Sequence, residues 1–192
     1  MMWLKAALAL LVALAATSTS AENVDPGALG LHRSWSENAG WVDAQPNGPG
    51  GNGLHVADGQ VSGWLWSENV GWISASCANT GSCGDVAYGL HLEDDPDVPG
   101  LLRLTGNAWS ENAGWITTHC AQTNSCEKSD YGLRVDPESG LLDGYAWSEN
   151  LGWISFSCAN TSSCDKVDFG LQFDPAALAP ADPMIFADGL ED

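Results

Sequence analysis

Glu and Asn stand between two Trp residues in a seven-residue string that occurs four times. The string is WSENxGW, and its copies run from Trp35 to Trp41, Trp66 to Trp72, Trp109 to Trp115 and Trp147 to Trp153. Carboxylate and amide oxygens are ligands that Ca²⁺ prefers, and the same groups beside flat indole rings are suited to sugars. The candidate ligand-binding residues are therefore Trp35, Glu37, Asn38, Trp66, Glu68, Asn69, Trp109, Glu111, Asn112, Trp147, Glu149 and Asn150.

The same string also has a structural interpretation, which we favour. Asn tolerates left-handed backbone angles and Gly adopts them without steric cost, so ENxG is typical of a tight hairpin turn whose Glu side chain lies in solvent. Trp packs a large area, and small β modules with few Leu or Phe often use it in the core. We therefore expect the Trp pairs to be core residues. An exposed row of eight rings would instead predict a surface for a sugar or a polymer.

Two acidic turns are the other candidates for a metal site. Their carboxylates are hard oxygen ligands, but neither turn has the ligand spacing of an EF-hand or of a glycine-rich calcium repeat, so solvated acidic loops are favoured. The four His residues occupy unrelated positions in the repeats and predict no common metal site. The candidate calcium ligands are Asp94, Asp95, Asp97, Asp136 and Glu138.

Six cysteines form three pairs with one spacing, as CANTGSC, CAQTNSC and CANTSSC. An even count in an exported chain, with one pair in each repeat, favours local disulfides over the other 14 of the 15 connectivities that six cysteines permit. The gap differs from that of zinc knuckles and thioredoxin-like motifs, which disfavours a metal or redox site. We expect each bridge to stabilise the fold by roughly 2 kcal/mol. The predicted disulfides join Cys77 to Cys83, Cys120 to Cys126 and Cys158 to Cys164.

Nothing in the sequence matches a nucleophile elbow, a phosphate-binding loop or an HExxH string. A catalytic constellation usually needs one asymmetric site, whereas this chain repeats four near-equal copies. We therefore predict that the protein is not an enzyme. We also predict no cofactor, with calcium as the alternative.

The elements that position these residues follow from aligning the four copies, which we number as modules 1 to 4 in chain order. Each predicts a strand a of the GLRVD type, a Pro/Gly/Asp turn, a strand b that ends in AWS, the ENxG hairpin and a strand c such as WISFS. A hairpin loop of five residues would pair the two Trp rings directly, whereas a loop of four would set each opposite a different neighbour. The expected fold class is all-β, with about 12 short antiparallel strands in a closed ring, barrel or propeller-like arrangement.

The two ends of this repeat array complement each other. Module 1 has strands b and c with only a stub of a, and residues 169–174 form a strand a with nothing behind it. We expect this strand to complete module 1 of its own chain, because internal closure costs no translational freedom and leaves no free sheet edge. Donation of the strand to the next molecule is the alternative, and it would build a polymer.

The chain divides into three parts. Lys5, an apolar run and a small-residue cleavage site predict a signal peptide over residues 1–21. Residues 22–175 form a single β-repeat domain, and residues 176–192 a flexible acidic tail. The formal charge of −19 disfavours nucleic acid and anionic membranes and favours divalent cations and basic partners. We expect a monomer without membrane insertion, secreted or at the cell surface, with the periplasm as the alternative.

The repeats resemble those of uncharacterised exported bacterial proteins in which strings such as AWGENVGWI recur. The resemblance covers most of residues 29–174, and the tail DPMIFADGLED is similar to the IFADGFE type of ending on secreted bacterial proteins. The resemblance implies export but no particular activity.

Three functions remain open at this point. The leading hypothesis is a non-enzymatic structural and interaction protein, made of disulfide-stapled Trp-rich repeats, that acts outside the cell on a glycan or another surface protein. The second is a lectin-like module that binds glycans, with or without calcium. The third is a fibre subunit that polymerises by strand exchange.

Overall fold

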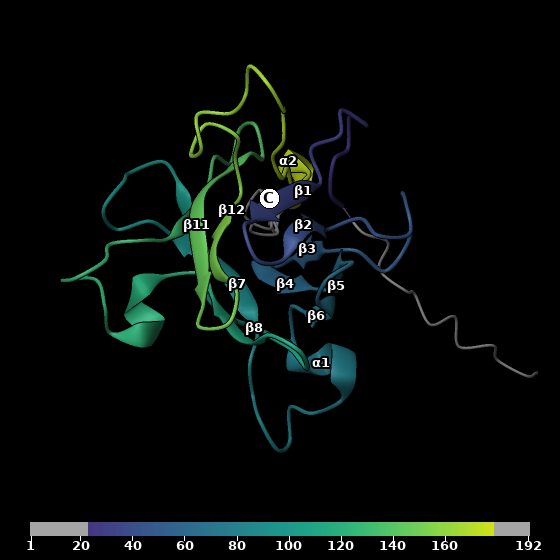
Figure 1. The fold of residues 1–192 in the computed structure, drawn as a ribbon, viewed down its shortest axis with the longest axis vertical. Coiled ribbons are helices and arrows are strands. Elements are labelled where there is room, and N and C mark those ends of the chain that lie inside the picture. The colour runs from purple at the N-terminus through teal and green to yellow at the C-terminus, as the bar shows by residue number, and fades with distance from the viewer. Residues whose placement is uncertain (1–22, 179–192) are drawn as a thin grey trace, which may run out of the picture.

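The computed structural model describes residues 23–178, which fold into an antiparallel β-barrel (Figure 1). The predicted signal peptide and residues 179–192 of the predicted tail lie outside the described residues. The helical segments are α1 (Cys77–Thr80), η1 (Cys120–Thr123) and α2 (Pro175–Leu178). The strands are β1 (Arg33–Ser36), β2 (Gly40–Asp43), β3 (His55–Ala57), β4 (Gln60–Ser62), β5 (Trp64–Ser67), β6 (Gly71–Ser74), β7 (Leu90–Asp94), β8 (Leu102–Ser110), β9 (Gly114–Thr117), β10 (Leu133–Val135), β11 (Leu142–Ser148) and β12 (Gly152–Ser155).

The barrel closes because each module supplies one hairpin to a ring of strands. Around the ring the order is β12, β1, β2, β5, β6, β8, β9, β11 and back to β12, and every neighbouring pair is antiparallel. A closed ring leaves no unpaired sheet edge. The predicted fold class, all-β with about 12 antiparallel strands in a closed barrel, is confirmed.

The first halves of the b strands form a second tier of pairs with the a strands. β3 pairs with β4, β4 with β7, β7 with β8, β8 with β10, and β10 with β11. β8 therefore belongs to both tiers, and it bends at Gly106, where φ is +105°. A Cβ atom there would lie 2.0 Å from the carbonyl oxygen of Gly89. Only glycine lets strands a and b approach so closely. Gly63 and Gly144 occupy the same place in modules 2 and 4.

The C-terminal segment takes the place of strand a in module 1. Leu171 pairs with His32, Gln172 with Leu141, and Phe173 with Val24, all antiparallel. The N–H of Leu142 also donates to the carbonyl of Leu171 at 2.9 Å. The segment thus lies between module 4 and module 1 of the same chain, next to the N-terminal residues.

Helix α2 includes the first three residues of the predicted tail, 176–178. Leu178 is buried and α2 contacts β3, so apolar burial holds this segment against the domain.

The interior of the barrel is filled by aliphatic side chains of moderate size. Along each hairpin strand the side chains alternate between the interior and the outside, and the inward positions hold residues such as Val42, Leu65, Ile73, Ile116 and Ile154. The expectation that the Trp pairs form the core is wrong, because no Trp belongs to this cluster. Leu65 and Ser67 take the inward positions of the WLWS strand, so alternation places its indole rings outside.

All three predicted disulfides are present, and each closes a short turn after strand c, which is helical in modules 2 and 3. The turns begin with a side-chain cap: Ser76 Oγ and Ser157 Oγ accept from the backbone N–H two residues ahead, at 3.2 Å in both cases. In module 3 His119 takes this role, and its Nδ1 accepts from Ala121 N–H at 3.1 Å. The disulfide-closed segments project from the barrel in different directions (Figure 1).

Candidate functional site

The register of each hairpin places its two Trp residues directly opposite each other. Trp66 pairs with Trp72 and Trp109 with Trp115, and the same holds in modules 1 and 4. The five-residue option is therefore the observed one. The indole centroids lie 4.6–4.8 Å apart in edge-on or tilted geometry, an arrangement that aromatic rings prefer.

Both rings of each pair point outward from the barrel. The strand c rings are 39–43% exposed, and these are Trp41, Trp72, Trp115 and Trp153. The strand b rings are half-buried beneath them. The barrel thus carries a belt of eight indole rings on its outer surface.

A third aromatic ring supports the exposed Trp of each module. Tyr88 packs on Trp115, Tyr131 on Trp153, and Phe169 on Trp41, with centroids 5.2–5.3 Å apart. Each comes from the residue before Gly-Leu in strand a. Module 2 has Asn52 at this position, and Trp64 of strand b packs on Trp72 instead, at 6.0 Å.

The four ENxG turns are linked into a ring at one end of the barrel. Each Asn side chain donates to the backbone carbonyl of the residue before glycine in the preceding module's turn. Asn69 Nδ2 donates to Ala39 O at 3.2 Å and Asn112 Nδ2 to Val70 O at 2.8 Å. Asn150 Nδ2 donates to Ala113 O at 3.0 Å, and Asn38 closes the circle on Leu151 O at 3.0 Å. These four candidate Asn residues therefore hold the modules together.

Grooves open on the outer surface where neighbouring modules meet. The strands β2 and β5, β6 and β8, and β9 and β11 are each joined by one residue pair, after which they diverge toward their turns. The exposed Trp of one module then faces the strand b Trp of the next. We call the spaces between modules 1 and 2, 2 and 3, and 3 and 4 the first, second and third grooves; their volumes are about 460, 770 and 550 Å³.

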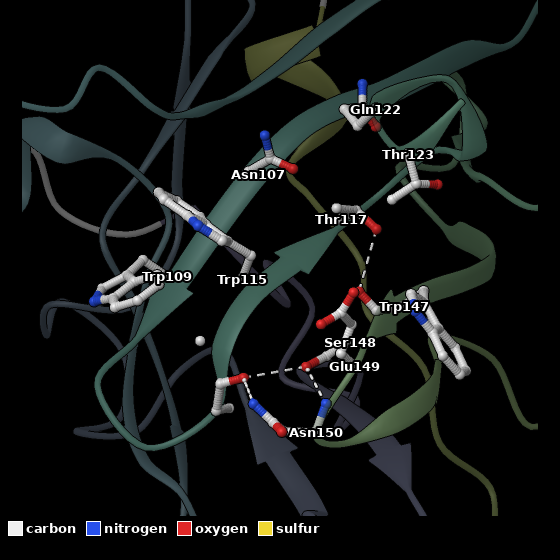
Figure 2. Close-up of a pocket in the computed structure, with 12 residues that line it drawn as sticks. Asn107, Trp109, Trp115, Thr117, Gln122, Thr123, Trp147, Ser148, Glu149 and Asn150 are labelled. Carbon is white, nitrogen blue, oxygen red and sulfur yellow. Dashed lines mark hydrogen bonds between the residues drawn. The ribbon is translucent and has the colours of Figure 1, made fainter. Parts of the chain in front are cut away.

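The third groove has aromatic walls and polar groups at its base and at one end. Trp109 and Trp115 lie on one side and Trp147 on the other, with Ser148, Glu149 and Asn150 between them (Figure 2). Thr117 Oγ1 donates to Trp147 O at 3.2 Å and so joins the two modules at the point where they diverge. Asn107, Gln122 and Thr123 lie at the other end of the groove (Figure 2).

Two amide side chains in this groove make no hydrogen bond within the described residues, and for Gln122 the reason is a contact that module 3 replaces. In modules 2 and 4 the residues that correspond to Gln122 are Asn79 and Asn160. Each donates to the carbonyl of the positive-φ glycine of its own module, Gly63 or Gly144. In module 3 the hydroxyl of Thr118 takes that carbonyl, Gly106 O, at 3.1 Å. Within the described residues, the side chains of Gln122 and Asn107 have no hydrogen bond, so both can bond a ligand.

The other two grooves share the indole walls but differ in their polar groups. The second groove is the most apolar, with Trp64, Val86 and Tyr88 added to the recurring Trp residues. The first groove contains Arg33 and Asp43, which form an ion pair at 3.5 Å.

Each groove contains one Glu from the hairpin tip of the following module. Glu68 lines the first groove, Glu111 the second and Glu149 the third, and all three side chains are exposed. In the described part of the chain none of them forms an ion pair. Glu37 is also exposed at its hairpin tip.

The acidic turns are organised by their own backbone. Asp95 is buried; it accepts from Asp97 N–H at 2.8 Å and from Arg134 Nε at 2.6 Å. Burial raises the pKa of Asp95, but hydrogen bonds from two backbone amides and from Arg134 outweigh burial, and the pKa lies below its ordinary value. Asp136 accepts from Glu138 N–H at 2.9 Å, and this bond, with those from Ser139, lowers its pKa.

These carboxylates are not gathered around a common point. Among residues 23–178, the groups of three ligand atoms within 4.8 Å of one another both contain disulfide-bonded cysteines, and none contains the candidates Asp94, Asp95, Asp97, Asp136 and Glu138. One such group includes His119. Burial, followed by the charges of Arg103 and Arg134, lowers the pKa of His119.

Several groove residues were not among the sequence candidates. The exposed Trp of strand c was considered only as one of a possible exposed row of eight rings and not as an individual candidate, and the free amides of Asn107 and Gln122 were not considered. Their position follows from the strand register and the inter-module pairing. The aromatic residue before Gly-Leu was visible in three modules, but its contact with the exposed Trp of the same module was not.

Within residues 23–178, the structure contains no helix with the length and apolarity needed to cross a membrane. The three disulfides indicate an oxidising environment. No model of a known protein family, no curated protein and no solved structure matches this chain.

Proposed function

We propose that this protein is an exported, non-enzymatic interaction protein that binds glycan chains in the grooves between its modules. The observation that carries the proposal is the recurrence of one groove, walled by the Trp pair of one module and the strand b Trp of the next, at three successive module boundaries. Sugar rings have apolar C–H faces that pack on indole, and hydroxyl groups that need hydrogen-bonding partners. The grooves offer both kinds of group side by side.

The third groove is the strongest site for such a ligand. Its free amides, Asn107 and Gln122, are donors and acceptors that nothing else in the described chain uses. Trp115 and Trp147 are the apolar surfaces on its two sides. Amide groups at one end and indole rings along the sides match a chain of hydroxylated rings that runs along the groove.

The arrangement of the grooves favours cross-linking over the binding of one long chain. The ring has eight strands and each module contributes two of them, so successive grooves are about a quarter of the ring apart and face different directions. One extended polymer cannot follow such a path around a narrow barrel. Separate chains in separate grooves would be held together by the barrel, which is a structural role in an extracellular matrix.

Repetition of the groove also supports a role without catalysis. Each groove repeats the same Trp, Glu and Asn positions, whereas catalysis needs a single set of groups with distinct tasks. Calcium has no part in the proposal. The strand-exchange fibre requires residues 171–173 to leave the position that they occupy between modules 4 and 1 of their own chain.

The proposal is tested by titrating the mature protein with uncharged, anionic and cationic hexasaccharides while Trp fluorescence and heat are measured. Trp115→Ala should weaken binding of the hexasaccharides that bind by at least about tenfold, because Trp115 lines the second and third grooves. Leu141→Ala is the matched control, since Leu141 is 42% exposed against 43% for Trp115 and lies outside the three grooves. A folded protein that binds none of the hexasaccharides would refute the proposal.

A further inference from the structure

We propose that the glycan bound in the grooves is cationic, a chain of amino sugars whose amines are free and protonated. This inference rests on the proposed function and names the class of its ligand. The starting point is that the first, second and third grooves each contain one Glu, namely Glu68, Glu111 and Glu149, that has no ion-pair partner among the described residues.

The charges that line the grooves and have no ion-pair partner are all negative. Glu149 is the only charged residue of the third groove and Glu111 the only one of the second, within the described chain. In the first groove Arg33 is engaged by Asp43, which leaves Glu68. The whole chain carries a formal charge of −19 and adds a field of the same sign. An anionic glycan is therefore repelled and a cationic one attracted.

The indole rings strengthen the same preference. The face of a Trp ring carries the negative part of its quadrupole, so it attracts a cation placed over it. In the third groove Glu149 stands between Trp115 and Trp147 (Figure 2). A protonated amine that reaches Glu149 is thus also close to aromatic faces that exclude water. The ring C–H groups of the same sugar pack on the indole walls, and its hydroxyls bond the amides of Asn107 and Gln122.

Position explains why this carboxylate recurs. Glu lies at the hairpin tip beside the Asn that fastens each module to the preceding one, so it always projects at the mouth of the groove. Among the described residues the Glu side chain makes no hydrogen bond in the turn itself, where the backbone N–H of Asn donates to Ser Oγ. A turn that needed only solubility at this position would be served equally by Lys or Gln.

The test compares three hexasaccharides of similar length: the glucosamine hexamer, its fully N-acetylated form and the uncharged glucose hexamer. Wild-type protein should bind the glucosamine hexamer at least about tenfold more tightly than the other two at pH 5.5, where the amines are protonated. The triple variant Glu68→Gln, Glu111→Gln, Glu149→Gln should lose this preference while its affinity for the glucose hexamer changes by less than about twofold.

A second triple variant separates groove recognition from overall charge. Asp58→Asn, Asp97→Asn and Glu138→Gln remove the same number of charges from exposed turns at the opposite end of the strands. This control should keep the preference within about twofold. If it loses the preference as fully as the groove variant, or if the glucose hexamer binds wild type as tightly as the glucosamine hexamer, the cationic ligand is refuted and glycan binding stands. If no hexamer binds, the proposed function fails with it.

Discussion

Gly106 lies within the barrel, in strand β8. Replacing it by Ala should lower the free energy of unfolding more than a Gly→Ala change of similar backbone angle in an exposed loop. The left-handed φ of +105° costs a side-chain-bearing residue about 1–3 kcal/mol. The new Cβ would also lie 2.0 Å from Gly89 O. Relief of that overlap requires strand β7 to move away from β8, which weakens the bond from Asn107 N–H to Gly89 O, now 3.2 Å long. Overpacking and one lost backbone bond add about 2–4 kcal/mol, so the total is about 3–7 kcal/mol.

Gly100→Ala is the matched control for this measurement. Gly100 has a φ of +91°, and nothing lies within 4 Å of the position of its Cβ, so only the backbone cost of about 1–3 kcal/mol applies. Urea unfolding of the oxidised protein, followed by far-UV circular dichroism, gives both free energies of unfolding. We expect Gly106→Ala to lose at least about 2 kcal/mol more than Gly100→Ala. Equal losses would show that the close approach of β7 and β8 does not require glycine.

Three further changes probe the disulfides and the titrating groups. Replacing Cys77 and Cys83 together by Ser should lower the free energy of unfolding by about 2 kcal/mol, measured in urea, because the loop is short. The pKa of His119 is lower in the folded state than in the unfolded state, so the unfolded state binds the proton more readily. The fold therefore has its full stability above pH 6.5 and loses this contribution as pH falls through the folded pKa. His119→Ser, which replaces the Nδ1 cap by the Oγ cap found in modules 2 and 4, should flatten the stability profile below pH 6.5; an unchanged profile would contradict this reasoning. Asp95→Asn removes the charged bond to Arg134 and should cost about 1–3 kcal/mol at pH 7. Because the folded pKa of Asp95 is lowered, the stability difference between wild type and Asp95→Asn should be present above pH 3.8 and vanish as pH falls through the folded pKa. A difference that does not depend on pH would refute the role of the charge.

The sequence was sufficient to predict the strands and a closed all-β fold, because these follow from local signals repeated four times. The Asn-x-Gly turn sets the hairpin, the alternation of apolar residues sets the inner face, and the FGLQF segment supplies the strand that module 1 lacks. The local disulfides follow from the spacing within one repeat. Each of these predictions needs only residues that are close in the chain or identical between modules.

The inside and outside of each hairpin were assigned wrongly, because residue size was given more weight than alternation. In the WLWS strand, Leu65 and Ser67 face inward and Trp64 and Trp66 outward. Ser67 is buried because its hydroxyl donates to the carbonyl of Ala39 in the neighbouring turn. Without knowledge of that partner, nothing in the sequence indicated that a serine lies inside. The grooves depend on such contacts between modules, and no single repeat contains the information.

The closure of the barrel also fixes the order in which this chain can finish folding. Module 1 is the first to be synthesised, yet its strand a consists of residues 171–173, almost at the end of the described chain. A chain synthesised from its N-terminus therefore holds an incomplete module 1 until residues 171–173 have been made. The loop that this last pairing closes spans nearly the whole domain and carries the largest closure entropy in the fold. Local hairpins and disulfide-closed turns need no such long closure, so we expect the pairing of Leu171 with His32 and of Phe173 with Val24 to form last.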